Sequence, residues 1–208
     1  MKCLFIYAHL DDETILSYGT MLKLAKCNEI SILIMCGQGR NVTTQENIKI
    51  QQKRIDAFYK NCQKFNCILC KHKDITLSND IVKDEIRKHV NCISPDIVFS
   101  HLATDFHYEH RIVAEEVALA CRKQKNSSVK AFYSAAAPNM MQAFSLQEAF
   151  KPNYFIDITD YIDQKQEALE NYNMELPADS NDIRSAESIL AQNRHYGRLM
   201  NTNYCEPY

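Results

Sequence analysis

Five short apolar segments alternate with amphipathic segments through the first two thirds of the chain, and this alternation constrains the fold strongly. The apolar segments cover 3–8, 30–36, 66–71, 96–101 and 131–134. The intervening segments, about 14–27, 46–62, 80–92 and 110–124, carry apolar residues at helical spacing. Near-continuous hydrophobic strands separated by helices are typical of a parallel sheet covered on both faces. The sequence therefore predicts an α/β fold with a mostly parallel sheet and helices on both faces.

The last third of the chain adds a predicted strand at 154–158 and two polar-rich helices near 160–173 and 181–200. With 46% hydrophobic and 24% charged residues, the chain has enough apolar material for a substantial core. No internal repeat, low-complexity segment or linker interrupts the 208 residues. We therefore expect a single domain over 1–208.

Charge and hydropathy argue against several classes of partner. The net charge is −2, and no long block of one sign predicts binding to nucleic acid or an anionic membrane. No apolar run approaches the ~20 residues of a membrane span. The six apolar residues between Lys2 and His9 are too few for the core of a signal peptide. We expect a cytoplasmic protein with no membrane partner, whose nine cysteines are reduced.

One cysteine cluster invites a structural zinc site, because Cys62, Cys67, Cys70 and His72 lie close together in the sequence. Cys67 and Cys70, however, fall in a strand-like segment. Residues three apart on a strand face opposite sides of a sheet, which is a poor start for one tetrahedron of ligands. We therefore interpret these cysteines as small apolar residues of the core.

The stretch YAHLDDE (7–13) follows the first predicted strand and has two interpretations. Asp11, Asp12 and Glu13 precede a helical pattern, and acids in a first turn complement the exposed N–H groups of a helix. Alternatively, His9 and the acids lie at the carboxyl end of a parallel strand, where open α/β sheets bind their ligands. Polar residues at the ends of other strands would favour the second interpretation.

Two further strand ends carry such residues. The stretch ATDFHYEHR (103–111) follows the fourth strand and places Asp105, His107, Glu109 and His110 within six positions. The stretch GQGR (37–40) follows the second strand, and Arg40 there is a candidate for gripping a hydroxyl-rich or anionic group of a substrate. Both loops would meet the first loop at one edge of the sheet.

Combining the first and fourth strand ends yields a candidate metal site. His9, Asp12 and His110 supply two imidazoles and a carboxylate, a usual set of three protein ligands for catalytic zinc with the fourth position left to water. Asp11 is then the candidate general base. His107, in its protonated form, is the candidate that stabilises an oxyanion or gives a proton to a leaving amine.

Two acids of the second loop have a supporting role in this scheme. Asp105 or Glu109 would hold the imidazole of His107 in the required tautomer. Together these groups fit metal-assisted hydrolysis of an amide.

The motifs resemble those of a known family. AHLDDE (8–13) resembles the AHPDDE signature of the PIG-L/LmbE-like zinc N-deacetylases, and FHYEH (106–110) resembles their second motif. The stretches SPDIVFSH (94–101), NYFIDITDYIDQKQEAL (153–169) and YCEPY (204–208) are also similar to family segments. The chain departs from the family pattern at Leu10, where proline is usual, at Phe106, where arginine is common, and at Glu109, where aspartate is usual.

The resemblance implies a Rossmann-like fold, a divalent metal, generally zinc with Fe²⁺ as an alternative, and removal of an N-acetyl group from an N-acetylglucosamine-type sugar conjugate. By position it implies His9, Asp12 and His110 as ligands, Asp11 as base and His107 as acid or electrostatic partner. Hydrolysis of another amide, such as a thiol conjugate or natural-product intermediate, is the alternative within enzymes. A non-catalytic metal-binding protein is the alternative outside them, and a homo-oligomer stays open.

Overall fold

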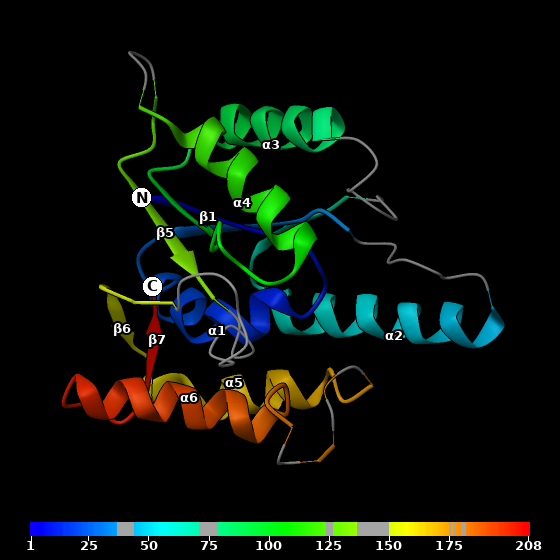
Figure 1. The fold of residues 1–208 in the computed structure, drawn as a ribbon, viewed down its shortest axis with the longest axis vertical. Coiled ribbons are helices and arrows are strands. Elements are labelled where there is room, and N and C mark those ends of the chain that lie inside the picture. Colours follow the sequence, from blue (N-terminus) through cyan, green and yellow to red (C-terminus); the bar gives the residue numbers. More distant parts are fainter. Residues whose placement is uncertain are drawn as a thin grey trace.

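A five-stranded parallel sheet forms the centre of the computed structural model (Figure 1). The structure describes residues 1–36, 44–70, 79–123, 127–136, 150–174, 176, 178–179 and 182–208. The strands follow the order β3-β2-β1-β4-β5, and every pair of neighbours is parallel. They are β1 (Lys2–Tyr7), β2 (Glu29–Ile34), β3 (Asn66–Leu69), β4 (Ile97–His101) and β5 (Ala131–Ala135).

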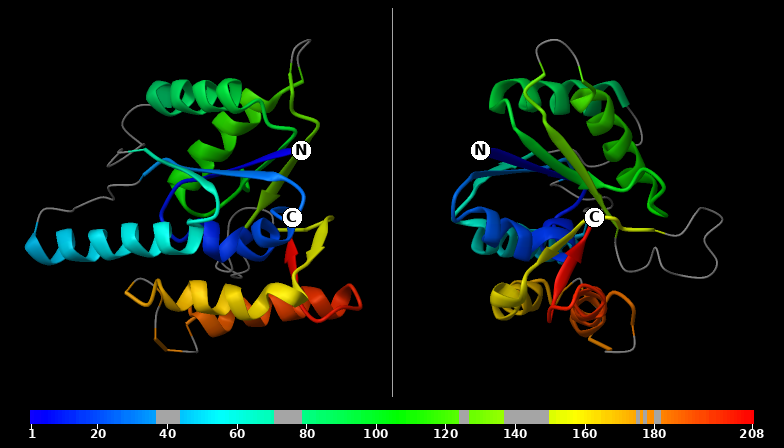
Figure 2. Two further views of the ribbon diagram at one scale, coloured as in Figure 1. Left: turned by 180° about the vertical axis from the view of Figure 1, so that it is seen from behind. Right: turned by 90° about the vertical axis from the view of Figure 1, so that its left-hand side faces the viewer.

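Four helices cover the two faces of this sheet, α1 and α2 on one side and α3 and α4 on the other (Figures 1 and 2). They are α1 (Asp12–Leu24), α2 (Gln45–Cys62), α3 (Asn79–Ile93) and α4 (Tyr108–Cys121). The predicted α/β class and the helices on both faces are therefore confirmed.

Alternate residues of the strands belong to two separate cores. Phe5 and Tyr7 of β1 pack into the core under α1 and α2, whereas Leu4 and Ile6 pack into the core under α3 and α4. This alternation explains why β1 reads as an unbroken apolar run, because both faces of the sheet are buried. Phe5 also stacks on its β4 neighbour Phe99, with ring centroids 4.4 Å apart.

The C-terminal third forms a further layer against α1 (Figure 2). It contains α5 (Ile162–Glu170), preceded by a short 3₁₀ turn (Thr159–Tyr161), and α6 (Ala186–Leu199). An antiparallel pair, β6 (Phe155–Asp157) and β7 (Cys205–Pro207), joins the two ends of this layer. The sequence predicts β6 and both helices but not β7.

A buried ion pair fastens this layer to α1. Lys165 of α5 and Glu206 of β7 are fully buried, and their Nζ and Oε1 atoms are 2.6 Å apart. Glu206 also accepts the backbone N–H groups of Gly19 and Thr20 at 3.0 and 2.7 Å, while Lys165 donates to the carbonyl of Ile15 at 2.9 Å. All three backbone groups belong to α1, so the ion pair is hydrogen-bonded to the main chain of this helix.

The cysteine-rich segment packs as expected from its spacing. Cys67 of β3 borders the core under α1 and α2, whereas Cys70 belongs to the core under α3 and α4. The thiol of Cys67 donates to the backbone carbonyl of Cys62, with Sγ and O 3.3 Å apart. His72 lies outside the described residues. No helix in the described ranges has the length and apolar character needed to cross a bilayer.

The connections of the sheet determine where the site forms. From β1 the chain passes to β2 on one side, and β4 occupies the other side of β1. The order of strands therefore reverses between β1 and β4, and open α/β sheets bind their ligands outside the carboxyl ends of the strands at such a point. The β1–α1 and β4–α4 loops carry the candidate residues.

Candidate metal centre

The β1–α1 loop brings His9 and Asp12 together by a sharp turn. Asp11, which precedes α1, has φ of 107°, a left-handed conformation that is uncommon for a residue with a side chain. This turn lets the carboxylate of Asp12 fold back and accept the backbone N–H of His9 at 2.8 Å. Asp12 thereby also meets the His9 ring, with Oδ2 3.4 Å from Nδ1.

His110 reaches the same place from the first turn of α4. Its Nε2 lies 3.2 Å from Nδ1 of His9 and 3.4 Å from Oδ1 of Asp12. Ligands that bind a tetrahedral zinc ion at ~2.0–2.1 Å lie about 3.3–3.4 Å from one another. The two imidazoles have this spacing, and each lies at it from a different oxygen of the Asp12 carboxylate, so the donors fit a divalent metal. Asp12, His101 and His110 likewise each place one ligand atom within 4.8 Å of the other two.

The other ring nitrogen of each histidine faces a buried carboxylate. Glu109 Oε2 lies 2.8 Å from Nε2 of His9, and Asp105 Oδ2 lies 3.1 Å from Nδ1 of His110. A carboxylate on one ring nitrogen fixes the tautomer and leaves the other nitrogen free to bind a metal. From the sequence, either Asp105 or Glu109 was expected to orient His107. In the structure they pair with the rings of His9 and His110 instead, and Asp105 contacts His107 through its backbone N–H at 2.8 Å.

Burial and the neighbouring charged groups shift the pKa values of His9 and Asp12. Burial lowers the pKa of His9, but Asp12 and Glu109 outweigh it and raise the pKa to about 10. Burial also opposes ionisation of Asp12, yet His110 and His101 hold its pKa well below the usual range. The centre therefore combines an ionised carboxylate with a protonated imidazole, and a metal would displace that proton.

His101, the last residue of β4, is a member of this cluster to which the sequence analysis gave no role. It is fully buried, stacks on His110 with ring centroids 3.9 Å apart, and accepts the N–H of Ala8 at 2.9 Å through Nε2. Burial and then the charge of His110 lower its pKa to about 4, so the ring is neutral at pH 7. In the sequence, its position at the end of the fourth predicted strand, just before the stretch 103–111, was the observation that could have indicated a role in the site.

Asp11 lies beside these ligand atoms, whereas a ring nitrogen of His107 lies within 4.8 Å of ring nitrogens of His9 and His110, so that these three histidines also form a group that could hold a metal ion. Asp11 is half-buried, and burial followed by the charge of Asp12 raises its pKa well above the ordinary value. His107 is exposed, and its ring packs edge-on against His9 with centroids 4.8 Å apart. Partial burial of that ring, together with His110 and His9, lowers its pKa to about 4.

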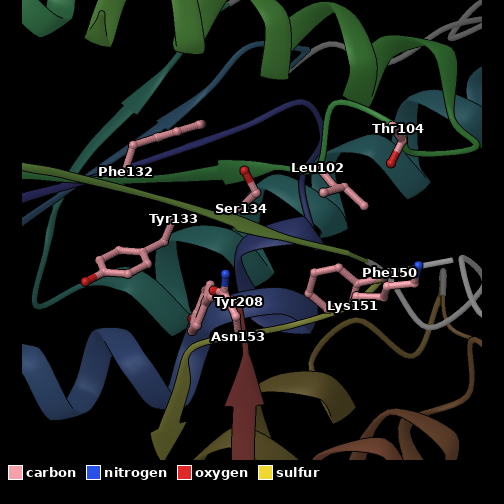
Figure 3. A pocket seen from close by; sticks show the side chains of 9 residues that line it. All are labelled: Leu102, Thr104, Phe132, Tyr133, Ser134, Phe150, Lys151, Asn153 and Tyr208. Atoms are coloured by element: carbon pink, nitrogen blue, oxygen red, sulfur yellow. The ribbon is translucent and has the colours of Figure 1, made fainter. Parts of the chain in front are cut away.

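A cavity of about 450 Å³ opens beside the β4–α4 loop. Figure 3 shows Thr104 of that loop and Ser134 of β5 on one side of it, with Phe150 and Lys151 on the other. The lining thus mixes hydroxyl, aromatic and cationic groups. The β4–α4 loop connects the cavity to the candidate metal centre, because it carries Thr104 as well as Asp105 and His107. Arg40, the expected substrate residue, lies outside the described residues.

Comparison with known families decides to which group the chain belongs. The family model described as PIG-L, GlcNAc-PI de-N-acetylase, matches residues 4–121, a segment that includes both site loops. The chain belongs to the PIG-L family. The family match ends with α4, so β5 and the whole C-terminal layer lie beyond it.

Solved structures share this fold at low sequence identity. N,N'-diacetylchitobiose deacetylase from Pyrococcus horikoshii is 20% identical with a TM-score of 0.75, over 99% of this chain and 82% of its own. The zinc-inhibited form of teicoplanin deacetylase Orf2 is 11% identical with a TM-score of 0.75, over 100% and 96%. The 4-carboxy-2-hydroxymuconate hydratase GalB from Pseudomonas putida is 14% identical with a TM-score of 0.70, over 99% and 94%. One fold thus carries both deacetylases and a hydratase.

Proposed function

We propose that this PIG-L protein is a divalent-metal-dependent hydrolase that removes the N-acetyl group, or a similar N-acyl group, from an N-acetylglucosamine-type sugar conjugate. One observation carries the proposal: Nδ1 of His9 and Nε2 of His110 lie 3.2 Å apart, and each lies 3.4 Å from one oxygen of the Asp12 carboxylate. Membership of a family described as de-N-acetylases supports the reaction class.

The donor set supports a cation at this position. When Glu109 and Asp105 hold the outer N–H groups, the inner nitrogens of His9 and His110 both present lone pairs, 3.2 Å apart. Two imidazoles with one carboxylate suit zinc and also Fe²⁺. When bound, such a cation would lower the pKa of a water in its remaining position toward ~7 and polarise the acyl carbonyl.

Asp11 and His107 would perform the proton and charge chemistry. The carboxylate of Asp11 would accept the proton of the attacking water, because a neighbouring cation would favour its ionised form and so oppose the rise in pKa that burial and Asp12 cause. His107, with a pKa of about 4, would enter as the neutral imidazole. The sequence-based scheme expected a protonated ring, and the lowered pKa differs from that expectation. A neutral ring would still donate its N–H to the developing oxyanion.

The cavity beside Thr104 supports a substrate larger than the acetamido group alone. Hydroxyl and amide side chains such as those of Ser134 and Asn153 can hydrogen-bond a sugar, and Lys151 adds a cation. A role for Arg40 in holding the substrate stays a proposal. Hydrolysis of a different amide would use the same metal centre, and only the cavity contacts would distinguish it.

A substrate panel tests the proposal. Purified protein loaded with Zn²⁺ or Fe²⁺ is incubated with N-acetylglucosamine, N,N'-diacetylchitobiose and aryl N-acetylglucosaminides, and released free amine is quantified. We expect release that a chelator abolishes and that His110→Ala lacks. A wild-type protein that binds the metal but releases no amine from any member of the panel would contradict the deacetylase proposal.

A further inference from the structure

The backbone of Asp11 is held in an unfavourable conformation by specific contacts. A residue with a side chain at φ of 107° is strained, and such strain persists only where the surroundings impose it. The N–H of Asp11 donates to Oε2 of Glu13 at 3.0 Å. From α2, Nη2 of Arg54 donates to the carbonyl of Leu10 at 3.0 Å. Both contacts hold the same peptide group, the one that joins Leu10 to Asp11, and so fix its orientation on the N-terminal side of Asp11.

Glu13 is itself held by a residue from the other end of the chain. It is fully buried, and its Oε1 accepts the hydroxyls of Thr14 and Tyr172, each at 2.8 Å. Tyr172 follows α5, is fully buried, and stands 159 positions from Glu13 in the sequence. A continuous chain of hydrogen bonds therefore runs from the Tyr172 hydroxyl through one carboxylate to the backbone of Asp11.

We propose that Tyr172, acting through Glu13, is a positioning residue that holds Asp11 in its left-handed conformation. The inference rests on the proposed function for the role of Asp11 as base. Nothing else about it depends on the reaction, because the hydrogen bonds exist in the protein without metal. Tyr172 also lies beyond residues 4–121, so this support for the catalytic turn comes from outside the segment that matches the family.

The physical reason is the way the Glu13 carboxylate is oriented. One of its oxygens receives two hydroxyls and the other receives the Asp11 N–H. Without the tyrosine hydroxyl, a single short side chain, that of Thr14, is left to hold Oε1. The carboxylate then gains rotational freedom, the Asp11 N–H loses its fixed acceptor, and the turn can relax toward an unstrained φ. A general base displaced by about 1 Å loses much of its effect.

The chain offers a matched control for testing this. Tyr18 is also a buried tyrosine whose hydroxyl donates a hydrogen bond, but its acceptor is the carbonyl of Asn61, at 2.9 Å, and not the carboxylate of Glu13. Tyr172→Phe and Tyr18→Phe should therefore lower the unfolding temperature by similar amounts. Only Tyr172→Phe should lower kcat, by roughly tenfold or more, with KM and metal content unchanged.

A second readout needs no activity. We expect hydrogen exchange at the Asp11 amide, followed in metal-free protein, to accelerate by about tenfold in Tyr172→Phe and to stay at the wild-type rate in Tyr18→Phe. Glu13→Gln, which places an amide where an acceptor is needed, should accelerate it as well, and this second variant keeps the test decisive if Tyr172→Phe folds poorly.

The two proposals fail separately. Equal exchange and equal kcat in the two tyrosine variants would overturn the positioning role, whatever the enzyme does. A wild-type protein with no deacetylase activity would overturn the proposed function, while the exchange measurement would still decide whether Tyr172 holds the turn.

Discussion

His9 lies between the carboxylates of Asp12 and Glu109, and in the metal-free protein these raise its pKa to about 10. The ring is therefore protonated below that pH, and a metal must displace the proton in order to bind. We expect the apparent affinity for Zn²⁺ to fall about tenfold for each pH unit between pH 8 and 6. Competition titration with a chelator of known proton affinity measures this slope.

Replacing one flanking carboxylate provides the control. Glu109→Gln removes a charge that raises the His9 pKa, so the variant should bind Zn²⁺ with a shallower pH dependence. An affinity that is independent of pH in the wild-type protein would mean that His9 does not bind the metal.

Asp11 is best removed by Asn, because asparagine tolerates a positive φ better than alanine does. If Asp11 is the base and not a ligand, Asp11→Asn keeps its metal and loses about 10²–10⁴-fold in kcat. Elemental analysis of the bound metal, together with steady-state kinetics, distinguishes a general base from a metal ligand. Loss of metal together with activity would assign Asp11 to the ligands instead.

The sequence was sufficient to bring His9, Asp12 and His110 together, because parallel strands place their carboxyl ends at one edge and ligand residues follow two of those ends. The sequence was not sufficient to predict which histidine each of the two acids, Asp105 and Glu109, contacts. Which ring nitrogen Asp105 and Glu109 face depends on the separation of β1 and β4 and on side-chain rotamers, which local spacing does not encode.

At the level of whole elements, α1 depends on the buried pair of Lys165 and Glu206. Lys165→Met leaves the Glu206 carboxylate buried without its counter-ion, and we expect a loss of about 3–5 kcal/mol in the free energy of unfolding, measured with urea. Lys23→Met is the control: Lys23 is exposed and also donates to one backbone carbonyl, that of Asp157 at 2.7 Å. Equal losses in the free energy of unfolding for the two substitutions would show that the buried ion pair contributes no more to stability than an exposed lysine does.

The strands and helices of the sheet were predictable to within a few residues, since each carries its own periodicity. β7 was not. It spans only Cys205–Pro207, contains a proline, and becomes a strand because it pairs with β6, with Phe155 opposite Pro207. A three-residue segment has no repeat to detect, and its partner lies some fifty positions earlier in the chain.

Across the whole molecule, metal binding joins elements from both halves of the sheet and should raise global stability. A cation at a hundred times its dissociation constant adds about 2.7 kcal/mol, which for a chain of this size raises Tm by roughly 5–10 °C. Thermal unfolding with and without chelator measures the shift. His110→Ala should abolish it, and a shift that survives in this variant would place the bound ion elsewhere.

The hydrogen bonds between Glu206 and the main chain of α1 also have a consequence for the order in which the protein folds. Gly19 and Glu206 are separated by 187 positions in the sequence. Contacts of such long sequence separation form late and slow folding. The hydrogen bonds that anchor α1 to the C-terminal layer are therefore expected to form late, after the strands and helices of the central sheet have assembled.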